Sequence, residues 1–126
     1  MKALLDTDII VDFLRTKEKS KNLIKDVSDD KITAYISVLT EAEILSGDEC
    51  SNREKMIIAD ELLSLFKRIE VSSELARKGA DFRRTHKIPL TDAIIAATAI
   101  KLSVPIYSRN TKHFGKITEI KIEAPY

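Results

Sequence analysis

The sequence predicts a three-layer α/β fold, in which a mostly parallel sheet of about five strands lies between two layers of helices. Short apolar segments with strand character alternate with helical segments, and this alternation implies parallel strands joined by right-handed crossovers. Residues 92–102 are apolar almost all round, which is typical of a helix buried on most sides. Because the chain has no internal repeat and no linker rich in proline or glycine, residues 1–126 are predicted to form one domain.

The amino-terminal half supplies two predicted strands and four predicted helices. Apolar periodicity predicts strands at residues 2–5 and 32–38, and helices at residues 9–14, 19–27, 40–45 and 51–66. The third of these helices is expected to stop at Gly47, because glycine commonly ends helices. Ser51 followed by Glu54 is a capping-box pattern, which predicts where the fourth helix begins.

The carboxyl-terminal half continues the alternation. Strands are predicted at residues 69–71, 104–107 and 120–122, and helices at residues 73–84 and 92–102. The helical faces within residues 56–66 and 75–82 carry more apolar surface than one layer on a sheet can bury. This surplus predicts an interface with a second copy of the chain.

Composition restricts the class of protein. The formal net charge is +1, so the molecule as a whole has no basic field for attracting nucleic acid. The single cysteine, Cys50, excludes an intramolecular disulfide and suits a reducing cytoplasm. An acid at position 6 argues against a signal peptide, and no apolar run approaches the roughly 20 residues of a membrane span. We therefore expect a cytoplasmic protein without a membrane partner.

Four polar residues from distant parts of the chain are predicted to meet at one edge of the sheet. Asp6 follows the first strand, Glu43 lies in the helix after the second, and Asn110 follows the strand at residues 104–107. Asp92 opens the apolar helix, close to its positive end. In open α/β sheets, ligands bind at the carboxyl ends of the strands. The sequence therefore predicts a site built from these four residues.

Three carboxylates in one pocket predict a metal ion. Like charges within a few ångströms oppose joint ionisation unless a cation neutralises them. Oxygen ligands favour a hard divalent cation, Mg²⁺ or Mn²⁺, held by Asp6, Glu43 and Asp92. Such an ion can activate water and stabilise a phosphoryl group under attack. Zinc is not expected, because His86 and His113 are far apart in the sequence and no paired cysteines accompany them.

Four segments in order give the chain a family resemblance. They are LLDTDII at residues 4–10, ISVLTEAEILSG at 36–47, LTDAIIAATA at 90–99 and SRNTKHF at 108–114. With them the chain resembles PIN-domain ribonucleases, in particular the VapC-like toxins of toxin–antitoxin pairs. The resemblance implies that Asp6, Glu43 and Asp92 match the family's main acidic positions. It also implies Mg²⁺- or Mn²⁺-dependent cleavage of single-stranded RNA, a homodimer and a cognate antitoxin.

The fourth segment departs from the family pattern. Many members carry a fourth acid where this chain has Asn110, and others have an acid where this chain has His113. Three carboxylates suit one divalent cation better than two, so we expect a single metal of weak affinity. The amide of Asn110 is expected to donate to a neighbouring carboxylate or to water on the metal. His113 is expected to be a surface or packing residue, or otherwise to touch the RNA or a reacting water.

Several of these residues also have simpler interpretations. Asp6 and Asp8 can each cap the first helix, and a cap or structural hydrogen bond is the favoured interpretation of Asp8. Basic residues in two places, Arg83, Arg84, His86 and Lys87, and Arg109 with Lys112, either line a path for phosphates or form a solvated charged face.

Two other functions are compatible with parts of the sequence. Asp6-Thr7-Asp8 resembles the start of haloacid-dehalogenase-type phosphatases, in which the first aspartate is a nucleophile. Ile9 and Ile10 follow where that pattern has small residues, and no paired-aspartate loop appears later. The other alternative is a PIN scaffold that binds RNA or a partner without cleaving it. Metal-dependent cleavage of single-stranded RNA distinguishes the three hypotheses.

Overall fold

The computed structural model describes all residues from 1 to 126 and contains a sheet of five strands that are all parallel. The strands are β1 (Lys2–Leu5), β2 (Thr33–Ser37), β3 (Lys67–Ile69), β4 (Ile106–Tyr107) and β5 (Ile122–Glu123). Their order across the sheet is β3-β2-β1-β4-β5, which makes β1 the central strand. This confirms the predicted α/β fold.

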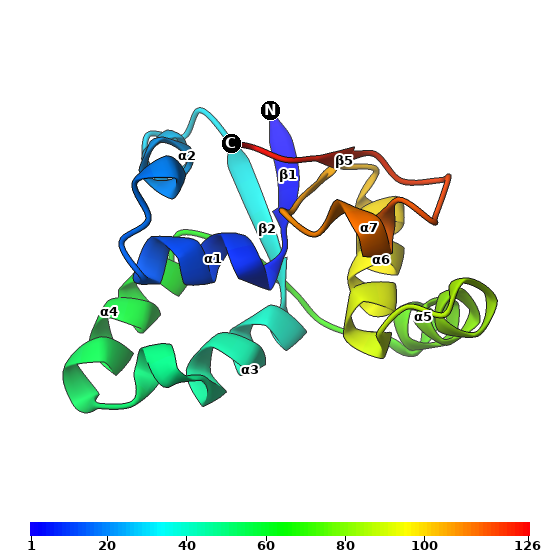
Figure 1. Ribbon diagram of the computed structural model, residues 1–126, viewed down its shortest axis with the longest axis horizontal. Coiled ribbons are helices and arrows are strands. Elements are labelled where there is room, and N and C mark those ends of the chain that lie inside the picture. The colour runs from blue at the N-terminus through cyan, green and yellow to red at the C-terminus, as the bar shows by residue number, and fades with distance from the viewer.

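Helices cover both faces of the sheet (Figure 1). On one face lie α1 (Thr7–Leu14), α2 (Glu18–Ser28), α3 (Val38–Ser46) and α4 (Arg53–Leu63), with the single 3₁₀ turn η1 (Asp48–Cys50) before α4. On the other face lie α5 (Ser73–His86), α6 (Leu90–Leu102) and α7 (Thr111–Phe114). The predicted three layers are therefore present.

The central strand separates two apolar cores. Ala3 and Leu5 contribute to the core under α1–α4, whereas Leu4 between them contributes to the core under α5–α7. All three side chains are fully buried. Since successive side chains of a strand point to opposite faces, a continuous apolar run is required wherever both faces are covered. The apolar run before Asp6 therefore holds that residue at a fixed place between the cores.

The contact between α5 and α6 brings two helix backbones close together. α6 is buried from Ala93 to Ala99, and four of these seven residues are alanine. On α5, Gly79 faces Ile94: a Cβ placed there would lie 2.5 Å from Ile94 Cγ1 and 3.0 Å from its Cα. Small residues on both helices permit this approach, and it fixes the position of the helix that carries Asp92.

Several predicted boundaries were wrong. Asn52, not Ser51, caps α4, because the Ser51 amide still bonds to Asp48 in the preceding turn while the Asn52 side chain accepts from the Lys55 amide. That helix ends at Leu63 instead of near residue 66. Gly47 does end α3, but in an extended conformation (φ −92°) instead of the left-handed one.

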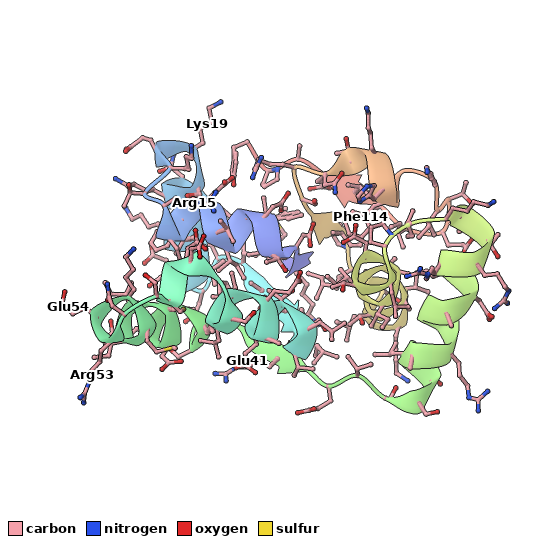
Figure 2. The ribbon with its side chains drawn as sticks, turned by 60° about the horizontal axis from the view of Figure 1, so that its bottom comes forward. Arg15, Lys19, Glu41, Arg53, Glu54 and Phe114 are labelled. Atoms are coloured by element: carbon pink, nitrogen blue, oxygen red, sulfur yellow. The ribbon has the colours of Figure 1, made fainter.

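The short elements were the hardest to predict. β3 begins at Lys67, before the predicted residues 69–71, because it is an edge strand and its first two residues are exposed cations without an apolar pattern. α7 was not predicted, since four residues are too few to show helical periodicity. Figure 2 shows Phe114 at its end, between α7 and α6, where it is fully buried.

The predicted apolar surplus exists on α4 but not on α5. Leu75 and Phe82 are 3% and 6% exposed, because α5 turns its apolar face onto α6. On α4, Ile57 and Ile58 remain 50% and 55% exposed. The correction confines the surplus to one helix. Separately, no helix has the length and apolar character needed to cross a membrane.

Replacement of Gly79 by alanine should lower the free energy of unfolding by about 1–3 kcal/mol, the usual cost of overpacking. In an open helix the same change stabilises by roughly 0.5–1 kcal/mol, so the clash with the Ile94 backbone reverses the sign. Urea denaturation measures the effect. Ala80→Ser, at an exposed position on the same helix, is the control and should change little. A stabilised Gly79→Ala variant would contradict the close approach of α5 and α6.

Candidate active site

The strand order reverses at β1, and this reversal creates the site. The chain adds β2 and β3 on one side of β1 and then returns to place β4 and β5 on the other. The segments that leave β1 and β4 therefore diverge, and ligand sites form in such crevices at the carboxyl ends of the strands. Figure 2 brings this edge forward and shows α1 and α3 beginning side by side there. Asp6 follows β1 and Ser108 follows β4.

Asp6 is the buried centre of the site. Its side chain is 6% exposed, and both oxygens accept a hydrogen bond: Oδ1 from the Thr7 amide at 2.8 Å and Oδ2 from the Ser108 hydroxyl at 2.9 Å. The first bond makes it the N-cap of α1, as its simpler interpretation predicted. Burial, followed by the neighbouring charges of Asp8 and Asp92, raises the pKa of Asp6 to about 7. Asp6 is therefore a carboxyl that a nearby cation would help to ionise.

Glu43 is held near Asp6 by a threonine. The Thr7 hydroxyl donates to Glu43 Oε1 over 2.8 Å and lies 3.1 Å from the hydroxyl of the buried Thr40, which can donate back to it. The Thr7 backbone amide also donates a hydrogen bond to Asp6 Oδ1. One residue thus orients carboxylates that come from α3 and from the end of β1.

Asp92 contacts His113, which belongs to the segment after β4. Asp92 lies in the first turn of α6, and its Oδ2 is 2.6 Å from His113 Nδ1. The Asn110 amide group lies 2.8 Å from the same Nδ1. This nitrogen donates to Asp92 when it carries the proton and accepts from Asn110 when it does not. Asn110 therefore contacts His113 instead of a neighbouring carboxylate, and His113 is more than a surface or packing residue because it contacts Asp92.

One series of polar contacts joins the four predicted residues, with His113 Nδ1 bonded to either Asn110 or Asp92 depending on its proton. It runs from Glu43 through Thr7 to Asp6, and from Asp6 through Ser108 and Asn110 to His113 and Asp92. Segments from four parts of the chain therefore meet at one edge of the sheet. No three acidic, histidine or cysteine side chains stand in one group able to hold a metal ion, and Glu43 and Asp92 each accept a hydrogen bond from, or contact, a side chain of their own, Thr7 and His113 respectively.

Asp8 connects the start of α1 to the segment after β4. Its Oδ2 accepts from the Arg109 amide at 3.0 Å and lies 3.4 Å from the Ser108 hydroxyl, in line with the structural role expected of it. Its Oδ1 is buried without any partner. Burial raises the pKa of Asp8 above its usual value. A buried, unpartnered carboxylate oxygen beside Asp6 is a position that a cation or its water shell would satisfy.

Arg109 is neutralised by a second acid on α1. Its guanidinium contacts both oxygens of Asp12, with Nε 2.6 Å from Oδ2 and Nη2 3.0 Å from Oδ1. The Tyr126 hydroxyl donates to Asp12 as well, at 2.5 Å. This cluster fastens the segment that carries Ser108 and Asn110 to α1. It also removes Arg109 from the cations available to a phosphate.

The chemistry of the donors, taken singly, suits a hard divalent cation, although no three of them stand in one group. Each acidic candidate offers oxygen atoms as ligands. The buried Asp8 Oδ1 has no hydrogen-bond partner, and burial of Asp6 opposes its ionisation. Sequence reasoning missed the roles of Ser108 and His113. Ser108 had a usable signal, since it follows β4 just as Asp6 follows the adjacent β1.

The chain is similar to known proteins over nearly its whole length. The PIN domain family model matches residues 3–119. Ribonuclease VapC10 of Mycobacterium tuberculosis is 28% identical over 123 residues, which cover 94% of this chain and 90% of that protein. A toxin–antitoxin complex from Klebsiella pneumoniae contains a chain with a TM-score of 0.81 and 28% identity, covering 98% of both chains. FitAcB from Neisseria gonorrhoeae gives a TM-score of 0.76 with 26% identity, over 98% of this chain and 97% of that one.

Asp6→Asn should make metal-free protein more stable at pH 8. The native state holds the Asp6 proton up to about pH 7, whereas the unfolded chain loses it near the usual aspartate pKa of 3.8. Since the native state binds more protons between these values, wild-type stability falls as pH rises through this window. The shift corresponds to at most about 4 kcal/mol, and Asn retains an oxygen for the Thr7 amide.

Urea denaturation in chelator, from pH 4 to pH 8, measures this effect. The two proteins should be close in stability near pH 4, and the variant should gain at least about 1 kcal/mol by pH 8. Glu119→Gln, which removes an exposed acid, is the control and should follow the wild type. Parallel curves for wild type and Asp6→Asn would show that burial does not oppose ionisation of Asp6.

Proposed function

The chain belongs to the PIN domain family, and we propose that it is a metal-dependent endoribonuclease that cleaves single-stranded RNA as the toxin of a toxin–antitoxin pair. The observation that carries the proposal is the series of polar contacts joining Asp6, Glu43 and Asp92 where the strand order reverses. The names of a ribonuclease and of toxin–antitoxin complexes among the similar proteins support the same activity.

Asp6, Glu43 and Asp92 are the residues proposed to hold Mg²⁺ or Mn²⁺. When bound, such an ion supplies Lewis-acid polarisation of a phosphoryl group and lowers the pKa of water. The protein's own groups prepare the ligands: Thr7 and Ser108 fix both oxygens of Asp6, and Thr7 also orients Glu43. Because these donors belong to the ends of adjacent strands, the carboxylates are oriented before any ligand binds.

His113 is proposed to position Asp92. Its Nδ1, 2.6 Å from Asp92 Oδ2, fixes one oxygen of that carboxylate and leaves the other available. Asn110 contacts the same nitrogen and can donate to it only when Nδ1 carries no proton. With an amide here instead of a fourth acid, the predicted ligand set carries three negative charges. We therefore propose one divalent cation per site.

A second function, RNA binding without cleavage, is favoured by one observation. Glu43 and Asp92 are each engaged by a side-chain donor, and no ready group of three metal ligands is formed. If these donors outcompete the cation, the protein binds RNA but does not cut it. The phosphatase hypothesis is set aside, because the chain belongs to the PIN family.

An open groove between α1, α2 and α4 is proposed to bind the antitoxin. It has a volume of about 560 Å³ and is lined by Phe13, Ile24, Ile58, Leu62 and Leu65. Lys21, Lys25 and Glu61 stand around these apolar side chains. An apolar floor bordered by charges of both signs suits one face of an amphipathic segment. The sequence predicted this α4 surface as the interface with a second copy; we assign it to the antitoxin instead, and propose that the homodimer implied by the resemblance forms elsewhere.

Cleavage of single-stranded RNA should require Mg²⁺ or Mn²⁺, and Asp92→Asn should reduce it at least about a hundredfold while the fold survives, because the cation loses a charged ligand. Asn110→Asp should tighten Mn²⁺ binding and increase cleavage at limiting Mn²⁺, since it adds a negative charge beside His113 and Asp92. Calorimetric titration of Mn²⁺ into the three proteins and cleavage of a labelled oligonucleotide measure both effects.

Asp26→Asn, on α2 in the amino-terminal half, is the matched control for the loss of one acid and should cleave like wild type. Undiminished cleavage in excess chelator would end the metal-dependent proposal. Unchanged Mn²⁺ affinity in Asn110→Asp would show that position 110 does not act on the cation.

Ile58→Asp should abolish binding of the protein encoded by the neighbouring reading frame, because a charge would be placed inside the apolar groove. Ile57→Asp is the control: Ile57 is equally exposed on α4 but does not line the groove. Light scattering of each variant, alone and with that partner, measures both assemblies.

Alone, all three proteins should have the mass of two 14.2 kDa chains. A monomeric wild type would refute the homodimer. If Ile58→Asp alone becomes monomeric, the groove binds a second copy of the chain instead of the antitoxin.

A further inference from the structure

A basic cleft lies where α5 turns into α6. It has a volume of about 500 Å³ and is lined by Arg83, Arg84, Lys87, Ile88 and Pro89. Three of these five residues are cations and none is an acid. Since the chain as a whole carries a net charge of only +1, this is a local concentration of positive charge.

The charges in this cleft are largely free. Arg83 and Lys87 form no salt bridge, and Arg84 pairs only with Asp81, at 2.7 Å on the exposed surface. Exposed pairs of this kind contribute little and exchange readily with other anions. The other basic candidate from the sequence differs, because Arg109 is already bound by Asp12 at 2.6 Å. Of the two basic groups considered as a path for phosphates, the other keeps only Lys112 without an acidic partner, whereas the one at the end of α5 has three cations in one cleft.

The amino end of α6 adds to the positive potential. Pro89 is its N-cap and provides no side-chain acceptor, so the amides of Leu90, Thr91 and Asp92 have no intrahelical partner. The helix dipole places partial positive charge at the same end. Leu90, beside the cleft, is 43% exposed and offers apolar surface of the kind on which an unstacked base can rest.

The cleft and the candidate active site share this helix end. Pro89 lines the cleft and Asp92 belongs to the site, and the two are three residues apart, about 4.5 Å along a helix axis. A polyanion that places one phosphate at Asp92 therefore brings adjoining phosphates to the cleft.

We propose that the cleft formed by Arg83, Arg84 and Lys87 binds the phosphodiester backbone of a single-stranded RNA whose scissile phosphate lies at Asp92. The assignment rests on the proposed nuclease function and adds to it the surface that holds the substrate. Contacts to phosphates position a strand without reading its sequence, so this cleft contributes affinity and register and leaves base preference to other surfaces.

The test compares two double variants that remove the same charge. Arg83→Ala/Lys87→Ala alters the cleft, whereas Lys2→Ala/Lys31→Ala removes exposed cations near the amino ends of β1 and β2, at the opposite edge of the sheet. Binding of a labelled single-stranded RNA of mixed sequence is measured by fluorescence anisotropy over a range of salt. Excess chelator is present, so that no cleavage occurs. Thermal unfolding checks that each variant is folded.

The cleft variant should bind about tenfold more weakly, and its salt dependence should fall by about 1.4 in log–log slope, or 0.7 for each lost phosphate contact. The control variant should stay within about twofold of wild type. Arg83→Lys/Lys87→Arg, which keeps both charges, should bind like wild type. Equal losses in the two alanine variants would overturn the inference, because the affinity would then come from overall charge.

A separate cleavage assay with Mg²⁺ distinguishes this inference from the proposed function. Loss of binding in the cleft variant together with no cleavage by any protein would retain the cleft and reject the nuclease. Cleavage by wild type together with unchanged binding in the cleft variant would retain the nuclease and reject the cleft.

Discussion

The carboxyl group of Asp6 is the feature on which the arrangement of the site depends. It accepts one hydrogen bond from the segment after its own strand and one from the segment after the adjacent strand β4. Those two segments belong to opposite branches of the sheet, because the strand order reverses between them. A single buried acid therefore connects the two branches, and its raised pKa reflects the cost of placing a charge there.

Rigid elements hold the other acids relative to Asp6. Asp92 lies on α6, whose alanine-rich face is buried between the sheet and α5, and the close approach at Gly79 fixes that helix. Glu43 lies on α3 and depends on Thr7 for its orientation. Side chains on packed helices keep their geometry better than side chains on loops, which suits a site that must place charged groups near a phosphate.

The segment from Ser108 to His113 is different, because it contains only the short α7 and relies on contacts with other elements. The Asp8 carboxylate accepts a hydrogen bond from the Arg109 backbone amide, and the Asp12 carboxylate pairs with the Arg109 guanidinium. Arg109, which the sequence suggested as a cation for phosphates, thus holds this segment against α1. A cleft with three cations lies at the end of α5, close to the amino end of α6, on which Asp92 also lies.

The sequence by itself determined the fold class, the order of the main strands and helices, and the placement of Asp6, Glu43 and Asp92 after strands or at a helix start. Apolar periodicity and the position of an acid after a buried strand are local properties, so they can be read along the chain. Only the tertiary structure decided that Thr7 orients Glu43, that His113 holds Asp92 and that Asp12 neutralises Arg109. Each of these contacts joins residues far apart in sequence. Their partners are selected by how the strands and helices pack, which no local pattern records.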